Sequence, residues 1–273
     1  MRPEDYAADL ALATEVARTA GAMALAEFGG NSSRWHKDDG SPVSAVDLAV
    51  DRYLREAIAA ARPDDGWLSE ETADSADRLG RRRVWVVDPI DGTRDFLRGR
   101  TGWAVSVALV ADGAVVAAAL HAPARAQMFT ASIGGGAFAD GARLGVSPLA
   151  TLEGVRLPID AANIAASFWP APWPGEAVEK PNSLALRMAK LAAGEADAWL
   201  EGRTVAEWDV AAASLILAEA GGRVTDRHGA ALRFNQPQPR IAGIAAATPG
   251  IHAEVLARLE HALAVFAARR AKS

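Results

Sequence analysis

The stretch "VWVVDPIDGTRDF", residues 84–96, constrains the fold of this chain more than any other. Four consecutive apolar residues, Val84 to Val87, indicate a short strand inside a sheet that is covered on both faces. Asp88 and Asp91 follow directly, on either side of Pro89. Since proline cannot continue the hydrogen-bond ladder of a central strand, we expect the chain to turn there and to bring the two carboxylates together. The stretch therefore predicts a core strand that delivers two acids to one point.

The rest of the chain predicts two helices, then a mostly antiparallel sheet, then an alternation of helices and strands, which is an α+β fold. The expected helices cover residues 4–28, 45–61 and 251–271. The expected strands cover 84–87, 103–110, 114–121, 126–132 and 241–248. Each of the segments 183–200 and 207–226 is expected to begin with a further helix and to end with a further strand. Asp112-Gly113 predicts a hairpin turn. A soft boundary near residue 148 divides the chain into halves, 1–148 and 149–273, which we expect to form one compact catalytic unit.

Residues 147–182 are the hardest to interpret. Within them and up to Ser183, "FWPAPWPGEAVEKPNS" holds four prolines and two tryptophans, which predicts a stiff loop. Such a loop either packs on the surface or forms a lid near a ligand.

Composition excludes several classes of function. Half of the 273 residues are apolar, as in a globular chain, and the net charge of −5 disfavours a protein that binds a nucleic-acid polymer. There is no cysteine, and the five histidines show no metal-ligand spacing. The first residues do not resemble a signal peptide, and the most apolar region is interrupted at Asp112-Gly113, so we expect a cytoplasmic protein without a membrane span.

The two acids of residues 84–96 are followed by a potential anion site. The backbone amides of Gly92 and Thr93 would face the same space as Asp88 and Asp91. Carboxylates beside amide donors suit a phosphate that is bridged to the protein by metal ions. The alternative is an acidic turn that caps a short helix at "TRDFLRG".

Three other stretches place acids at the ends of apolar elements. Glu70 and Glu71 follow the expected short strand "GWLS", and either could be a solvated residue or a metal ligand. Asp47 lies at the start of the second helix and Asp209 opens an almost wholly apolar helix; each could be an ordinary N-cap. If these acids converge, two carboxylates about 4 Å apart cost on the order of 4 kcal/mol at an effective dielectric of 20. Divalent cations relieve that repulsion, and an all-oxygen ligand set favours Mg²⁺ or Mn²⁺ over zinc.

"WVVDPIDGTRDF" and "EWDVAAASLILAEAGG" together resemble the two signature motifs of the inositol monophosphatase superfamily, with "WLSEE" and "SPVSAVD" upstream in the same order. The likeness covers nearly the whole chain. Within the superfamily the chain looks most like the bacterial 3'(2'),5'-bisphosphate nucleotidases, on the stretches "DGSPVS", "GWLSEET" and "LRFNQ" and on the spacing from Asp197 to Asp209. The resemblance implies a layered αβαβα sandwich, hydrolysis of a small phosphate ester such as adenosine 3',5'-bisphosphate, inhibition by Li⁺ and often a homodimer.

The same resemblance implies a metal site with two or three Mg²⁺ ions, for which Mn²⁺ could substitute. Glu70, Asp88 and the Ile90 carbonyl would hold the first ion, and Asp88, Asp91 and Asp209 the second. A third, weaker ion would use Glu70 and water molecules.

It also implies the residues that act on the substrate. Asp47 and Thr93, together with Glu70, would orient and deprotonate the attacking water, and no covalent phosphoenzyme would form. The residues expected to contact the substrate are Asp91, Gly92, Thr93, Ser183, Glu201 and Asp209.

The departures from the family pattern lie on the side of the leaving group. Asn182-Ser183 stands where the family usually has Gly-Ser, and "VRLPIDAA" replaces a "VSRSH"-like strand. Glu201 is one residue out of register with the Glu that contacts inositol hydroxyls in the inositol enzymes. These departures leave the expected metal chemistry intact and put the identity of the substrate in doubt.

Three other functions stay open on the sequence alone. The first is an inositol-1-phosphatase or another sugar-phosphate phosphatase on the same scaffold, which Glu201 would support. The second is a phosphatase of the haloacid dehalogenase type with Asp88 as nucleophile, although that type spaces its acids by two residues and not by three. The third is a metal-binding or regulatory protein without turnover, although none of the expected acids is missing.

Overall fold

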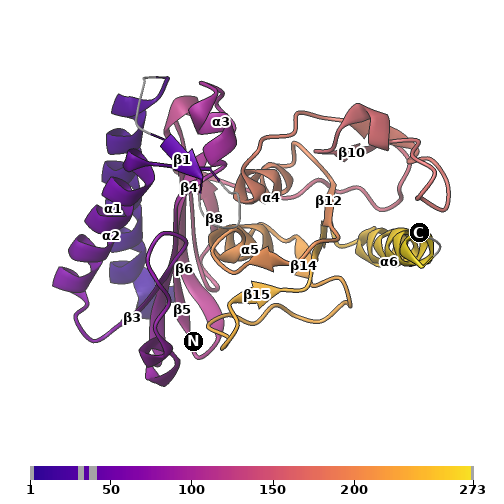
Figure 1. Ribbon diagram of the computed structural model, residues 1–273. Coiled ribbons are helices and arrows are strands. Elements are labelled where there is room, and N and C mark those ends of the chain that lie inside the picture. Colours follow the sequence, from indigo (N-terminus) through magenta and orange to yellow (C-terminus); the bar gives the residue numbers. More distant parts are fainter. Residues whose placement is uncertain (1–2, 30–33, 37–41, 272–273) are drawn as a thin grey trace.

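The computed structural model describes residues 3–29, 34–36 and 42–271 (Figure 1). The stretch "DGSPVS" lies partly outside them, because residues 39–41 are not described. A seven-stranded sheet with the order β3-β4-β5-β6-β7-β8-β9 forms the centre of the first half. Its strands are β3 (Gly66–Ser69), β4 (Arg83–Asp91), β5 (Ala104–Ala111), β6 (Ala114–Ala122), β7 (Gln127–Ser132), β8 (Gly136–Ala139) and β9 (Ala142–Arg143). β3 is parallel to β4 and every other neighbour in this sheet is antiparallel, as the sequence predicts.

The apolar run of β4 is explained by burial on both faces of the sheet. Trp85 and Val87 belong to a core that they share with α1 (Ala7–Glu27) and α2 (Ala45–Ala61). Val84 and Val86 point the other way, into a core shared with α4 (Leu184–Ala192) and α5 (Ala211–Glu219). Because successive side chains of a strand face opposite sides, a strand between two helical layers needs apolar residues at every position.

The layers continue beyond α4 and α5. A three-stranded antiparallel sheet of the order β12-β16-β14 packs on these helices, and α6 (His252–Arg270) covers its outer face. The strands are β12 (Ala198–Glu201), β14 (Arg223–Thr225) and β16 (Ile244–Ala247). Trp199 lies in the core with α4 and α5, whereas its neighbour Ala198 lies in the core with α6. The five layers, helices, sheet, helices, sheet and helix, follow one another across Figure 1 and confirm the expected sandwich.

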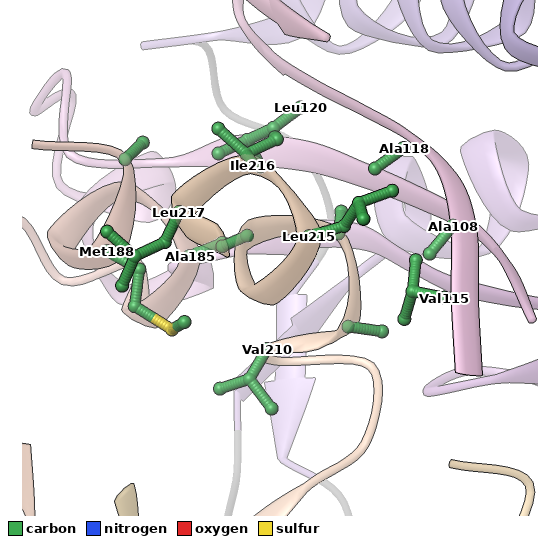
Figure 2. Close-up of a cluster of buried hydrophobic side chains, with 14 of the residues drawn as sticks. Ala108, Val115, Ala118, Leu120, Ala185, Met188, Val210, Leu215, Ile216 and Leu217 are labelled. Carbon is green, nitrogen blue, oxygen red and sulfur yellow. The ribbon is translucent and has the colours of Figure 1, made fainter. Parts of the chain in front are cut away.

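Helix α5 is the apolar centre of the molecule. Figure 2 shows Leu215 and Ile216 of α5 directed toward sheet residues Val115, Ala118 and Leu120. The side chains from Ala211 to Leu217 are all buried, so no face of this part of the helix is exposed to solvent. Its position fixes the turn that precedes it, and that turn carries Asp209.

β4 does not end at Pro89, as the sequence suggests; it continues to Asp91. Asp88 pairs with Ser106 and Asp91 with Ala104 on β5, so β4 accommodates one extra residue in a bulge between its two acids. The proline is tolerated because a bulge interrupts the ladder locally without ending the strand.

Shorter elements complete the fold. They are the 3-10 helices η1 (Pro3–Tyr6), η2 (Ala76–Gly80), η3 (Pro123–Arg125) and η4 (Ala161–Asn163), helix α3 (Thr93–Leu97), and the paired strands β1 (Arg34–His36) with β2 (Pro42–Ser44), β10 (Val155–Leu157) with β11 (Gly175–Ala177), and β13 (Val205–Ala206) with β15 (Arg240–Ile241). The expected strand 241–248 is thus two strands separated at Gly243, whose φ is 71°.

The proline- and tryptophan-rich segment is not without structure. It contains β11, follows η4, and packs against α6: Trp173 is buried under the Arg258 guanidinium, 4.4 Å from the ring centroid, and the Phe168 and Phe266 rings lie 5.0 Å apart. These contacts favour the packing alternative over a lid. Among the described residues, no helix has the length and apolar character needed to cross a membrane.

Candidate active site

A pocket of about 280 Å³ opens where the bulge of β4, the start of α3 and the start of α4 meet. Its lining includes seven of the site residues expected from the sequence and five others. They are Glu70, Asp88, Ile90, Asp91, Gly92, Thr93 and Asp209, and then Arg94, Asn182, Leu184, Arg187 and Arg203. Asp47, Ser183 and Glu201 are not among the lining residues, but each is hydrogen-bonded to one that is.

The bulge of β4 sets the direction of the first two acids. The Ile90 amide donates to Oδ1 of Asp88 at 3.0 Å, which closes a small turn inside the bulge. Gly92 follows with a φ of 95°, and a Cβ there would lie 2.7 Å from the Gly102 carbonyl oxygen and 2.9 Å from the Ser183 amide. Only glycine fits this position, so the chain can pass from β4 into α3 without leaving the pocket.

Asp91 joins β4 to the N-terminus of α4. Its Oδ2 accepts from the Ser183 hydroxyl at 2.5 Å and from the Ala185 amide at 2.8 Å, and its Oδ1 accepts from the Leu184 amide at 3.1 Å. Ser183 caps α4, since its hydroxyl oxygen also accepts from the Leu186 amide at 2.9 Å. The second signature acid therefore also serves as the anion at a helix N-terminus.

Asp47 is the third residue of α2, whose N-cap is Ser44, and it is also a neighbour of Thr93. Its Oδ2 accepts from the Ser44 amide at 2.9 Å and from the Ser44 hydroxyl at 2.5 Å, which makes a capping box at the start of α2. Its Oδ1 accepts from the Thr93 hydroxyl at 3.4 Å, while the same hydroxyl lies 3.0 Å from the Ile90 carbonyl oxygen. The N-cap expected at Asp47 is in fact Ser44, and Asp47, three residues on, completes the capping box while lying beside the pocket.

The second half of the chain supplies the other wall. Asp209 lies in the turn before α5, not in the helix itself, and its Oδ2 accepts from the Ala206 amide at 2.9 Å. Glu201, at the end of β12, holds Arg203 through both guanidinium and amide hydrogen bonds, the shortest at 2.9 Å. Glu201 thus orients an arginine of the lining instead of facing the pocket itself.

The carboxylates raise one another's pKa. Burial, followed by the charges of Glu70, Asp91, Asp209 and Asp47, raises the pKa of Asp88 well above its usual value. Burial and then the charges of Asp91 and Glu70 raise the pKa of Asp209 to about 8. Burial raises the pKa of Asp91 to about 6, against the hydrogen bonds from the start of α4. The pocket is therefore a place where negative charge is concentrated without enough positive charge to balance it.

Such a site suits hard divalent cations, which take carboxylate and carbonyl oxygens as ligands. Among the residues that the structure describes, however, no three acidic or histidine side chains already stand in a metal-binding arrangement. The hydrogen bonds explain this: one oxygen each of Asp88 and Asp209, and both of Asp91, face backbone amides or a hydroxyl. The donor set fits Mg²⁺ in its chemistry and location, and binding would require side-chain rotations toward a shared centre.

Sequence reasoning missed the cationic part of the pocket. Arg94 directly follows Thr93, and Arg187 lies one turn into α4, where its Nε donates to the Pro181 carbonyl at 2.8 Å. Burial lowers the pKa of Arg187, and the charges of Asp91 and Glu201 oppose that effect. The arginine at the end of "DGTR" was a visible signal, whereas the placement of Arg187 and Arg203 depends on packing of distant elements.

Comparison with known proteins places the chain among phosphatases. The sequence model of the inositol monophosphatase family matches residues 5–264. A Streptomyces griseus protein named glucose-1-phosphate thymidylyltransferase is 39% identical over 232 residues, 82% of this chain and 88% of its own. Histidinol-phosphatase of Mycobacterium tuberculosis is 36% identical over 267 residues, 92% and 97% of the two chains, and inositol-1-monophosphatase of Rhizobium meliloti is 35% identical over 195 residues, 68% and 73%.

Solved structures share the fold over the same length. The extragenic suppressor protein suhB of Bartonella henselae superposes with a TM-score of 0.80 at 28% identity and covers 93% of this chain and 98% of its own. The IMPase of Thermotoga maritima superposes with a TM-score of 0.79 at 27% identity, with 93% and 97% covered.

Proposed function

This chain belongs to the inositol monophosphatase family of phosphoric monoester hydrolases, and we propose that it hydrolyses the phosphate ester of a small polyol, such as inositol 1-phosphate, with the help of Mg²⁺. The observation that carries the proposal is the meeting of Glu70, Asp88, Asp91 and Asp209 in one pocket, beside the Gly92-Thr93 turn. These acids come from β4, from the end of β3 and from the turn before α5. Both halves of the chain, 1–148 and 149–273, would therefore act as one catalytic unit.

The proposed cation ligands are Glu70, Asp88, the Ile90 carbonyl, Asp91 and Asp209. Bound Mg²⁺ would neutralise the phosphate and lower the pKa of a water molecule. The acids can bind divalent cations because the repulsion among the carboxylates is relieved when cations bind.

Thr93 and Asp47 are the proposed proton acceptors. The Thr93 hydroxyl lies between Asp47 and the Ile90 carbonyl, so its oxygen can accept a proton from water while its own proton moves to Asp47. Burial raises the pKa of Asp47, which makes this carboxylate a better base than an exposed aspartate. Thr93 and Gly92 would bind phosphate through their backbone amides, since the first amides of a helix have no partner within it.

The arginines of the pocket affect which leaving group the site accepts. Arg94, Arg187 and Arg203 also line the pocket and would repel a cationic amino alcohol that lies beside them. A neutral polyol meets no such penalty, and its hydroxyls can accept from guanidinium groups. This argues for inositol 1-phosphate over histidinol phosphate, although a histidinol-phosphatase is among the relatives described above.

The bisphosphate nucleotide expected from the sequence has less support. None of the relatives described above is named a bisphosphate nucleotidase. One of them is named an inositol-1-monophosphatase, which was the alternative. The arginines would also suit a second phosphate, so the nucleotide stays an outcome to be tested.

Release of inorganic phosphate should be measured with Mg²⁺ from inositol 1-phosphate, histidinol phosphate and adenosine 3',5'-bisphosphate in parallel. We expect the highest kcat/KM for inositol 1-phosphate and no turnover in excess EDTA, with recovery when Mg²⁺ is added back. Turnover in EDTA would refute the metal mechanism. Faster hydrolysis of either other ester would refute the polyol preference, and a sugar nucleotide formed from glucose 1-phosphate and dTTP would point instead to the transfer named for the Streptomyces relative.

A further inference from the structure

Helix α2 carries a second buried carboxylate, Asp51, one turn after Asp47. The two residues are four positions apart, so they lie on the same face of the helix. Asp51 is 6% exposed and is not among the pocket lining. Neither the family signature motifs nor the proposed mechanism uses it.

Asp51 accepts hydrogen bonds from two hydroxyls at and just after the end of β3. The Ser69 hydroxyl donates to its Oδ1, and the Thr72 hydroxyl donates to its Oδ2 at 2.5 Å. Ser69 is the last residue of β3, and Thr72 lies three residues further on. Only Glu70 and Glu71 separate the two, so Asp51 holds both ends of the short segment that contains a proposed metal ligand.

Glu70 lies close to three other carboxylates. Its charge is among the causes that raise the pKa of Asp88, of Asp209 and of Asp47. A segment held at one point could swing its acid toward solvent. Two hydrogen bonds to one carboxylate restrict that motion from both sides.

The far end of the same loop is fixed independently. The Arg78 side chain donates to Asp74 at 2.6 Å, to the Asn235 side chain at 2.6 Å and to the Gln236 carbonyl at 2.9 Å. The loop therefore does not depend on Asp51 alone for its fold. Loss of the Asp51 hydrogen bonds should loosen Glu70 locally and leave the rest of the loop in place.

We propose that Asp51 is a positioning residue that holds Glu70 in the pocket through Ser69 and Thr72, and so sets the affinity of the site for divalent cations. The inference rests on the proposed function, in which Glu70 is a ligand of Mg²⁺. Residues that orient a metal ligand without touching the metal typically contribute about 10- to 100-fold in affinity or activity.

The test compares Thr72→Val with Thr72→Ser, a matched pair in which the first loses the hydroxyl and keeps the shape, while the second keeps the hydroxyl. Asp51→Asn is made alongside, and Asp9→Asn serves as the control, because Asp9 is a buried acid that binds Arg62 and Arg83 away from the pocket. Binding of Mn²⁺ alone is followed by electron paramagnetic resonance of the free ion. The Mg²⁺ concentration for half-maximal rate and the KM for inositol 1-phosphate at saturating Mg²⁺ are measured on the same samples.

We expect Thr72→Val and Asp51→Asn to weaken Mn²⁺ binding about tenfold and to raise the half-maximal Mg²⁺ concentration equally, with KM nearly unchanged. Thr72→Ser and Asp9→Asn should bind Mn²⁺ like the wild type. Unchanged Mn²⁺ affinity in Thr72→Val would overturn the inference while the proposed function stands, even if Asp51→Asn failed to fold. A wild-type protein that binds no Mn²⁺ and hydrolyses no phosphomonoester would instead refute the proposed function, and the inference with it.

Discussion

The Ser183 hydroxyl donates to Oδ2 of Asp91 at 2.5 Å, across 92 positions of the sequence. This bond joins the bulge of β4 to the first turn of α4, and so joins the two halves of the chain at the pocket. The bonds to Ser183, Leu184 and Ala185 leave Asp91 only one acceptor position, on Oδ1, for a further ligand. If Asp91 binds a cation, it does so through that oxygen.

Ser183→Ala should therefore affect stability and activity together. It removes the cap of α4 and one of the hydrogen bonds that orient Asp91, at a cost of about 1–2 kcal/mol in the free energy of unfolding. We expect kcat/KM to fall about tenfold, to be measured with urea unfolding and phosphate release. Ser214→Ala is the control, since that hydroxyl donates to the Ala211 carbonyl within α5. Equal losses of activity in both variants would contradict a role through Asp91.

Asp209→Asn should inactivate the protein and yet stabilise its metal-free form. Burial, with the charges of Asp91 and Glu70, makes ionisation of Asp209 unfavourable, and Asn can still accept from the Ala206 amide. We expect at least a 100-fold loss of kcat and a higher Tm at pH 8 in EDTA. Asp197→Asn should instead lower the Tm, because hydrogen bonds from Arg156 and Ser147 outweigh burial and lower the pKa of Asp197. A lower Tm for both variants would argue against repulsion in the pocket.

The metal-free protein should lose stability as the pH rises. The pKa of Asp91 is raised to about 6 and that of Asp209 to about 8, mainly by burial, from an ordinary value of 3.8. An acid whose pKa is higher in the folded state contributes stability below its unfolded pKa and loses that contribution as the pH rises through the folded value. The Tm in EDTA should therefore fall as the pH rises from the ordinary pKa of 3.8 to about 8, with the loss complete near 6 for Asp91 and near 8 for Asp209. Saturating Mg²⁺ should reduce this slope, because bound cations favour the ionised acids. A Tm that rises over this range in EDTA would show that the acids are not in conflict.

Arg78→Met should destabilise the protein without changing the chemistry of the pocket. The Arg78 side chain is 2% exposed and bridges Asp74 to the turn at Asn235 and Gln236. Because Asp74 is itself 39% exposed, we expect a loss of about 2 kcal/mol and not the larger cost of a fully buried pair. Arg82→Met is the control, since its pair with Asp112 is 78% and 54% exposed and should contribute less than about 1 kcal/mol. Urea unfolding of both variants decides the question.

Arg203→Met tests the leaving-group side. Arg203 is held by Glu201 and lines the pocket. None of the hydrogen bonds described above joins it to Glu70, Asp88, Asp91 or Asp209. We expect a several-fold higher KM for inositol 1-phosphate with kcat nearly unchanged, the pattern of an interaction made equally in the ground and transition states. A selective fall in kcat would instead give Arg203 a part in the reaction itself.

Much of this fold could be predicted from local patterns. The apolar run of β4, the hairpin at Asp112-Gly113 and the apolar run of α5 each depend on residues close in sequence, because strand and helix periodicity and turn conformation are local properties. The positions of Glu70, Asp88, Asp91 and Asp209 at the ends of such elements, together with the paired motifs, were enough to predict that they meet.

The sequence by itself thus determined the elements and the acids of this protein. The tertiary structure decided that β4 runs through Pro89, because pairing with β5 resumes beyond the bulge. It also decided that Asp91 accepts hydrogen bonds from the N-cap and first amides of α4, and that Asp51 accepts from both ends of the segment of Glu70. These contacts join residues that are 18 to 94 positions apart, and no local pattern specifies such a pair. They exist because close packing of five layers leaves each buried carboxylate only those partners that the neighbouring layer brings within hydrogen-bond distance.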